Sequence, residues 1–381
     1  MKLLLQSALS EINAAIKITG SKSETNRLLL LKALFPNITL ANTSNSDDSE
    51  VMQKALNGSD EIVDIHHAGT AMRFLTAYFA SQENKTVTLT GSSRMKERPI
   101  KILVEALNQL GAKIEYLEND GFPPIKIKGK KLTLSKVSLQ ANVSSQYISA
   151  LLLIAPSLQN GLELELIGEI TSISYINMTL NLLQEIGVET SFIGNIIVVK
   201  SKTQNPKPKT IIVESDWSSA SYYYSIIALS KEGTQIELSS FKENSLQGDA
   251  ILATIYQQMG VETHFEKGKI TLIKNSKPIN QNIKIDLNNA PDIAQTIAVT
   301  AFGLGIGCQL TGLHTLKIKE TDRLEALKKE LSKLGAAISV TNESLRIEPS
   351  KSINSNQNIA TYNDHRMAMA FAPLALKTNI N

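Results

Sequence analysis

A lysine and an arginine lie at the start of an apolar helix in residues 20–31, GSKSETNRLLLL. Lys22, Ser23 and Arg27 could bind an anion there, because the first turn of a helix leaves backbone N–H groups unpaired and carries partial positive charge. The segment is not a Walker phosphate loop, since Ser21 separates the glycine from the lysine. The residue types therefore indicate an anion-binding helix start of another kind.

Further basic residues accompany other helix starts. Arg73 lies near the start of the apolar helix that begins at residue 69, Arg366 lies at a start near residue 363, and Arg98 directly precedes a helix-starting proline. An arginine near the start of an apolar helix is costly unless it meets an anion. These cations suit a substrate that carries phosphate and carboxylate groups.

Candidate proton-transfer groups lie in two more segments. Residues 317–327, KIKETDRLEAL, place Lys319, Glu320 and Arg323 within one turn, and Asp292 directly follows Pro291 at a helix start. Capping and surface ion pairs explain each segment by itself. Taken together, the segments supply an acid and a base beside the cations.

The helix starts recur along the chain. Six apolar segments open with small or polar residues, at Ser23, Gly69, Ser144, Ser218, Pro291 and Asn363. After a first interval of 46 residues, the intervals are 72 to 75 residues. Amphipathic segments between them end at Gly111, Gly187, Gly260 and Gly335, where glycine suits the left-handed end of a helix. The pattern predicts an α/β repeat, and its period carries the last repeat past Asn381, so we expect that repeat to be truncated.

Length and composition restrict the class of protein. A chain of 381 residues that is 42% hydrophobic predicts two or three globular domains. The net charge of +3 is dispersed, which argues against a nucleic-acid or membrane-surface partner. The single cysteine, Cys308, excludes an internal disulfide framework and a thiolate metal site, and we interpret it as a buried apolar residue. No apolar run has the length of a signal-peptide core or a membrane span, so we expect a cytoplasmic protein.

These segments resemble the motifs of the 5-enolpyruvylshikimate-3-phosphate synthase (3-phosphoshikimate 1-carboxyvinyltransferase) family. The matching stretches are GSKSETNR, AGTAMR, RMKERP, SSQYISALL, DWSSASYY, PDIAQTIA, KETDRL and YNDHRMA, in the family's order. The resemblance implies an α/β fold, a two-domain inside-out α/β barrel with three βαβαββ repeats per domain. Residues 1–19 and 217–381 would form a discontinuous domain with residues on the phosphoenolpyruvate side. Residues 20–216 would bind shikimate 3-phosphate, with the active site in the cleft between the domains.

The resemblance also assigns site residues. It implies that phosphoenolpyruvate is contacted by Lys22, Gly69, Arg98, Arg323 and Arg366. It implies that shikimate 3-phosphate is contacted by Ser23, Arg27, Ser144, Ser145, Gln146 and Ser172. Asp292 would hydrogen-bond the shikimate hydroxyls, Lys319 would contact the same ring, and Glu320 would take part in proton transfer.

The implied reaction moves the enolpyruvyl group of phosphoenolpyruvate to the 5-hydroxyl of shikimate 3-phosphate by addition and elimination, with release of phosphate. Such a route needs a base, an acid and cations that hold two phosphates and a carboxylate. We assign Asp292 as base, and Glu320 with Lys22 as the groups that protonate C3. The reaction requires no metal and no cofactor, and we expect a monomer whose partners are the two small-molecule substrates.

Two alternatives remain open. An enolpyruvyl transferase that acts on UDP-N-acetylglucosamine shares the fold, but that class typically uses a loop cysteine, whereas Cys308 ends an apolar run. A non-catalytic ligand-binding relative is the second alternative, although a binding protein has no need of proton-transfer groups such as Asp292 and Glu320. His365, beside Arg366, is either a structural neighbour of the site or a proton-transfer group.

Overall fold

The computed structural model describes residues 3–6, 13–141, 144–170, 173–202, 207–319 and 321–381. The chain separates into two compact units. We call Thr19–Glu214 the middle unit and call Met1–Ile18 with Ser215–Asn381 the terminal unit. The chain therefore passes from one unit to the other at residues 18–19 and 214–215, whereas the resemblance implied domain boundaries at 19–20 and 216–217.

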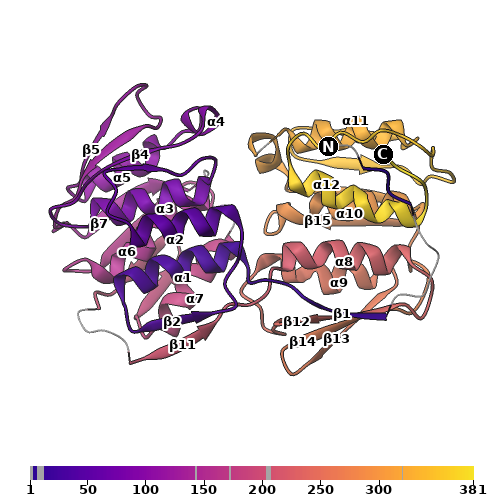
Figure 1. Ribbon diagram of the computed structural model, residues 1–381, viewed down its shortest axis with the longest axis horizontal. Coiled ribbons are helices and arrows are strands. Elements are labelled where there is room, and N and C mark those ends of the chain that lie inside the picture. The colour runs from indigo at the N-terminus through magenta and orange to yellow at the C-terminus, as the bar shows by residue number, and fades with distance from the viewer. Residues whose placement is uncertain (1–2, 7–12, 142–143, 171–172, 203–206, 320) are drawn as a thin grey trace. The chain divides into compact units, whose positions relative to one another are not determined.

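Three buried helices form the centre of the middle unit (Figure 1). They are α1 (Lys22–Leu34), α3 (Gly69–Ala80) and α6 (Ser145–Ile154), and they contact one another. In α3 every residue except Thr70 is buried. A helix that is apolar on all sides belongs in the interior of a protein. The predicted apolar segments are therefore the core of this unit.

Two four-stranded sheets and one strand pair surround these helices. The sheet orders are β3 (Ile62–Asp64), β4 (Thr86–Thr90), β6 (Ile125–Lys128), β5 (Lys113–Tyr116), and β7 (Lys136–Gln140), β8 (Leu162–Ile167), β10 (Ile196–Val199), β9 (Thr190–Ile193). The pair is β2 (Ile38–Ala41) with β11 (Lys209–Ile212). In each sheet the first two strands are parallel and the other pairs are antiparallel. The register sets Leu89 beside Val63 and Ile125, so buried residues share one face.

The terminal unit repeats this plan. Its central helices are α8 (Trp217–Leu229), α10 (Ala294–Leu304) and α12 (His365–Phe371). Its sheet orders are β1 (Asn13–Lys17), β12 (Gln235–Ser239), β14 (Lys269–Lys274), β13 (Val261–Glu266), and β15 (Asn282–Asp286), β16 (Gly307–Thr311), β18 (Leu345–Ile347), β17 (Ile338–Val340). Because β1 pairs in parallel with β12, the N-terminal segment belongs to this unit.

The second series of helices is amphipathic. It comprises α2 (Asp47–Asn57), α5 (Lys101–Gln109), α7 (Ile173–Glu185), α9 (Leu252–Gln257) and α11 (Arg323–Lys333). The predicted closing glycines after the last four of these helices have positive φ, between 80° and 97°. Residues 136–199 and 282–347 each follow the order βαβαββ, and residues 62–128 follow it with one additional short helix, α4 (Ser93–Lys96), which confirms the predicted repeat.

The last repeat is reduced in the described part of the chain. After α12 the chain forms a short 3₁₀ turn, Ala372–Leu376, and then two isolated bridges of Ile380, with Leu5 and with Gln357. Neither a four-stranded sheet nor an amphipathic helix follows α12 among these residues. None of the described helices combines the length and the apolar character needed to cross a bilayer.

Candidate active site

The middle unit brings together the starts of two of its central helices, α3 and α6. Lys22 and Gly69 are the first residues of α1 and α3, and Ser144 caps α6 by accepting a hydrogen bond from the backbone of Gln146 (3.4 Å). The Gln146 side chain donates to the Thr70 hydroxyl at 3.2 Å, so the starts of α6 and α3 are neighbours. Ser145 is buried in the first turn of α6.

Gly69 lies directly against Arg98. A Cβ atom at position 69 would come within 2.5 Å of Arg98 Nη1 and 2.9 Å of its Cζ. The half-buried Arg98 follows the short helix α4 (Ser93–Lys96), in the predicted basic segment. Two residues expected to contact phosphoenolpyruvate are therefore side by side, and glycine leaves the room that the guanidinium occupies.

Arg73 has a different role from the one its position indicated. Its side chain is buried, and it donates to the carbonyls of Gly69 (3.1 Å) and Pro99 (3.0 Å). The Tyr147 hydroxyl donates to the same Pro99 carbonyl at 2.6 Å, and the Arg73 guanidinium lies 5.8 Å from the Tyr147 ring. Arg73 therefore ties the start of α3 to the segment that carries Arg98, and it does so with backbone carbonyls.

Arg27 joins three helices of the middle unit. Its guanidinium donates to Thr179 Oγ1 on α7 (2.8 Å), Ser149 Oγ on α6 (3.0 Å) and the Ser23 carbonyl on its own helix (2.7 Å). It also lies 5.4 Å from the ring centre of Phe74. Burial lowers the pKa of Arg27 to about 10. Sequence reasoning did not find Thr179 and Ser149, whose hydroxyls lie on helix faces that look apolar.

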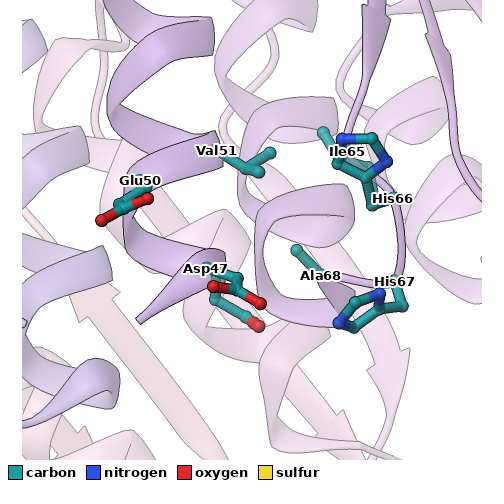
Figure 2. A pocket seen from close by; sticks show the side chains of 8 residues that line it. Asp47, Glu50, Val51, Ile65, His66, His67 and Ala68 are labelled. Carbon is teal, nitrogen blue, oxygen red and sulfur yellow. The ribbon is translucent and has the colours of Figure 1, made fainter. Parts of the chain in front are cut away.

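Lys22 has an acidic neighbour that the sequence did not single out. Its Nζ lies 3.9 Å from Asp48 Oδ1 in the first turn of α2. Asp48 also lines a cavity of about 200 Å³ with Asp47 and Glu50 on α2 and with His66 and His67 before α3. Figure 2 shows Asp47, Glu50 and the two imidazoles among the residues that line the cavity. The cavity therefore adjoins both the pair that includes Lys22 and the start of α3.

In the terminal unit, three of the predicted cations converge on Asp292. Lys319 Nζ lies 3.5 Å and Arg323 Nη1 3.2 Å from Asp292 Oδ1, and Arg366 Nη2 lies 3.3 Å from Oδ2. The Asp292 side chain is 16% exposed, so one edge of this cluster remains accessible. The residues come from four parts of the sequence, the turn Pro291–Ile293, the segment before α11, α11 itself and α12.

Asp364 holds both arginines of this cluster. Its buried carboxylate accepts from Arg323 Nε at 2.8 Å, and its Oδ1 accepts from the backbone N–H of Arg366 at 2.8 Å. Burial disfavours the charge of Arg366, but the Asp292 carboxylate and further acidic groups outweigh it, and the pKa of Arg366 is raised well above its ordinary value. Arg366 is therefore a permanent cation.

Asp249 is a second carboxylate that sequence reasoning missed. It lies in the 3₁₀ turn Gly248–Ile251 and accepts a hydrogen bond from Ser218 Oγ, which also lies 3.4 Å from Arg366 Nη2. Burial, reinforced by the charge of Asp292, raises the pKa of Asp249 to about 7. The only sequence signal was an aspartate after glycine at the start of a helical turn.

Three further expectations concern Ser172, Glu320 and Cys308. Ser172 and Glu320 lie outside the described residues. Cys308 is buried on β16, where burial raises the pKa of its thiol to about 12, so the interpretation as a buried apolar residue is confirmed. Among the described residues, no group of three or more histidine, cysteine, aspartate or glutamate side chains could hold a metal ion.

Solved structures and curated sequences resemble the chain over nearly its whole length. An EPSP synthase structure from Acinetobacter baumannii at 2.37 Å matches with a TM-score of 0.79 over 99% of this chain and 93% of that chain, at 20% sequence identity. The fold is therefore the two-unit α/β fold of that structure. The chain is 47% identical over 376 residues to the 3-phosphoshikimate 1-carboxyvinyltransferase of Bacteroides fragilis (strain YCH46), covering 98% of this chain and 90% of that protein. It is 37% identical over 407 residues to the protein of the same name from Histophilus somni (strain 2336), covering 99% and 93%.

Residues 44–380 match the family EPSP synthase (3-phosphoshikimate 1-carboxyvinyltransferase). With the fold and the curated relatives, this match places the chain among the transferases. The chain belongs to the EPSP synthase family of the shikimate pathway.

Proposed function

We propose that the chain transfers the enolpyruvyl group of phosphoenolpyruvate to the 5-hydroxyl of shikimate 3-phosphate and releases phosphate. The convergence of Lys319, Arg323 and Arg366 on Asp292 carries the proposal, because it places a candidate base among cations that a phosphate or carboxylate can share. The names of the relatives support the same activity.

Phosphoenolpyruvate would take two sets of contacts. In the middle unit, Lys22 and the Gly69–Arg98 pair offer an ammonium, a helix start and a guanidinium. In the terminal unit, Arg323 and Arg366 offer two guanidinium groups. The phosphate and carboxylate of the substrate would compete with Asp292 for these arginines and so release a carboxylate oxygen for proton transfer.

Shikimate 3-phosphate would bind through residues of the middle unit. The contacts expected for its phosphate are Ser23, Arg27, Ser144, Ser145, Gln146 and Ser172. Asp292 and Lys319 would contact the ring hydroxyls. That the two substrates bind between the units stays a prediction.

The chemistry proceeds by addition and elimination. Asp292 would accept the proton of the 5-hydroxyl while the hydroxyl oxygen forms a bond to C2 of phosphoenolpyruvate. Glu320 and Lys22 would supply a proton to C3. The resulting tetrahedral ketal then expels phosphate and loses a proton from the former C3. The cations stabilise the charge of the leaving phosphate.

Phosphate release with phosphoenolpyruvate and shikimate 3-phosphate tests the proposal. We expect turnover with this pair and none when UDP-N-acetylglucosamine replaces shikimate 3-phosphate. Turnover with the nucleotide sugar would favour the alternative enolpyruvyl transferase, which acts on UDP-N-acetylglucosamine. Binding of both substrates without phosphate release would favour a non-catalytic relative.

We further propose that the protein acts in the cytoplasm as a monomer without a nucleic-acid or membrane partner. The dispersed charge with a net value of +3 and the single buried cysteine support this proposal. Light scattering coupled to size-exclusion chromatography measures the oligomeric state directly.

A further inference from the structure

We propose that Glu330 on α11 is a positioning residue for Arg366. It anchors the segment Ala360–Asn363, which leads directly into the first turn of α12. The proposal rests on the proposed function, because it assumes that Arg366 contacts phosphoenolpyruvate. No motif in the sequence indicated Glu330.

Glu330 is a buried carboxylate on the apolar face of an amphipathic helix. Its side chain has no exposed surface, and its neighbours Leu327 and Leu331 on α11 are fully buried. A carboxylate in such a place costs desolvation free energy unless its oxygens are satisfied. Leucine would fill the position without this desolvation cost, so the contacts of the carboxylate must explain its presence.

Both carboxylate oxygens hold the segment before α12. Oε1 accepts a hydrogen bond from the Tyr362 hydroxyl at 2.6 Å, and Oε2 accepts one from the backbone N–H of Ala360 at 3.0 Å. Lys333, one turn along α11, pairs with Oε2 and donates to the Asn358 carbonyl at 3.1 Å. Glu330 and Lys333 together attach residues 358–362 to the helix.

The attached segment has a costly backbone conformation. Tyr362 and Asn363 have φ values of 56° and 53°, a left-handed region that a bulky residue such as tyrosine rarely adopts. Two such residues in succession persist only where surrounding contacts hold them. The hydrogen bond from Tyr362 to Glu330 is one of these contacts, and the turn from Thr361 O to Asp364 N (2.9 Å) is another.

Helix α11 is hydrogen-bonded to this segment at two points. Arg323 at its first turn binds Asp364, and Glu330, seven residues later on the same face, binds Tyr362. Asp364 in turn caps α12 at the backbone of Arg366. The turn between Tyr362 and Asp364 therefore sets where Arg366 lies relative to Asp292. Without Glu330 the contacts at Asp364 and between Lys333 and the Asn358 carbonyl remain, but residues 360–362 lose their hydrogen bonds to α11, and the turn can relax toward ordinary φ values.

Glu330→Leu and Glu330→Gln test this inference. Leucine suits the apolar surroundings but leaves the Ala360 N–H, the Tyr362 hydroxyl and Lys333 without this acceptor, so we expect a folded protein whose Tm is lower by roughly a few degrees. We expect its KM for phosphoenolpyruvate to rise about ten- to a hundredfold, since small misplacements of a binding group have effects of this size. The KM for shikimate 3-phosphate should change less than about twofold, because the residues expected to bind its phosphate lie in the middle unit and not beside Arg366. Glutamine keeps one acceptor oxygen and should restore part of the affinity.

Three further variants separate positioning from general loosening. Tyr362→Phe removes one hydroxyl and should raise the KM for phosphoenolpyruvate in the same direction. Glu325→Gln is the matched control, because Glu325 is an exposed glutamate on the same helix with its own lysine partner at i+3, Lys328. A Glu330→Leu/Arg366→Ala double variant should have the same KM as Arg366→Ala, because a residue that acts through Arg366 adds nothing once Arg366 is absent.

Hydrogen–deuterium exchange supplies a readout that does not depend on activity. In Glu330→Leu the amides of residues 360–367 should exchange faster, while those of the middle unit stay unchanged. Unchanged exchange in this segment would overturn the anchoring, and faster exchange with a wild-type KM for phosphoenolpyruvate would overturn the positioning role. Absence of turnover in the wild-type protein would instead refute the proposed function, and the exchange data would still decide whether Glu330 anchors the turn.

Discussion

The guanidinium of Arg98 fills the space where a side chain at Gly69 would begin, with Nη1 2.5 Å from the position of a Cβ atom. Gly69 is the first residue of α3, so its backbone N–H is one of the unpaired donors at that helix start. An anion there would meet a backbone dipole and a guanidinium together. This contact explains why glycine stands at the head of an otherwise buried, apolar helix.

Gly69→Ala should weaken phosphoenolpyruvate binding. The new methyl group would force Arg98 to move, so we expect the KM for phosphoenolpyruvate to rise about tenfold or more, with a smaller change in kcat. Steady-state kinetics with both substrates measures the effect. In an Arg98→Ala background the same glycine change should have little further effect, and full additivity of the two changes would contradict the explanation.

Arg27→Ala should reduce both stability and affinity for shikimate 3-phosphate. The variant loses the hydrogen bonds that join α1, α6 and α7, so we expect Tm to fall by roughly 3 °C or more. Loss of a phosphate contact should raise the KM for shikimate 3-phosphate. Arg94→Ala is the control, because Arg94 is exposed and pairs only at the surface with Glu97. A lower Tm with an unchanged KM would limit Arg27 to a structural role.

Asp292→Asn should act on the chemical step. Removal of the proposed base should lower kcat by about 10²- to 10⁴-fold. The KM for phosphoenolpyruvate should stay level or fall, since Lys319, Arg323 and Arg366 lose a competing carboxylate. Glu343→Gln, an exposed carboxylate in the same unit, is the control. A kcat within tenfold of the wild type would remove Asp292 from the role of base.

Asp249→Asn should stabilise the protein in a pH-dependent way. The pKa of Asp249 is raised from 3.8 to about 7, first by burial, so the native state holds a proton that the unfolded state has lost between these pH values. The loss of stability caused by ionising Asp249 in the wild-type protein is absent below the unfolded-state pKa of 3.8. It grows as the pH rises and is complete above pH 7. Thermal unfolding should show a gain in Tm of roughly 3 °C or more at pH 8 and little gain at pH 4. Equal gains at both pH values would contradict this assignment.

Cys308→Ser should leave turnover largely intact. Burial on β16 keeps this residue as a thiol, because its pKa is raised to about 12, and a thiol is a poor nucleophile. The hydroxyl should cost some stability in the apolar surroundings, so Tm is measured beside kcat. A collapse of kcat in a folded variant would instead favour the loop-cysteine chemistry of the alternative enolpyruvyl transferase.

The sequence determined the repeat and the six central helix starts. Helices such as α3 and α10 are mostly apolar and carry apolar residues around the whole helix, and such segments have no stable place except the interior. The closing glycines were equally readable, because a left-handed helix end disfavours residues that have a Cβ atom. Local chemistry of this kind leaves a signal in neighbouring residues.

Only the tertiary structure decided what each charged side chain meets. Arg73 and Arg98 look alike in the sequence, yet Arg73 binds two backbone carbonyls and Arg98 lies against Gly69. Asp292 and Arg366 are separated by 74 residues along the chain and meet only because α10 and α12 pack together. A buried charge is defined by partners that come from distant elements. Its environment therefore depends on packing, and no local pattern in the sequence records it.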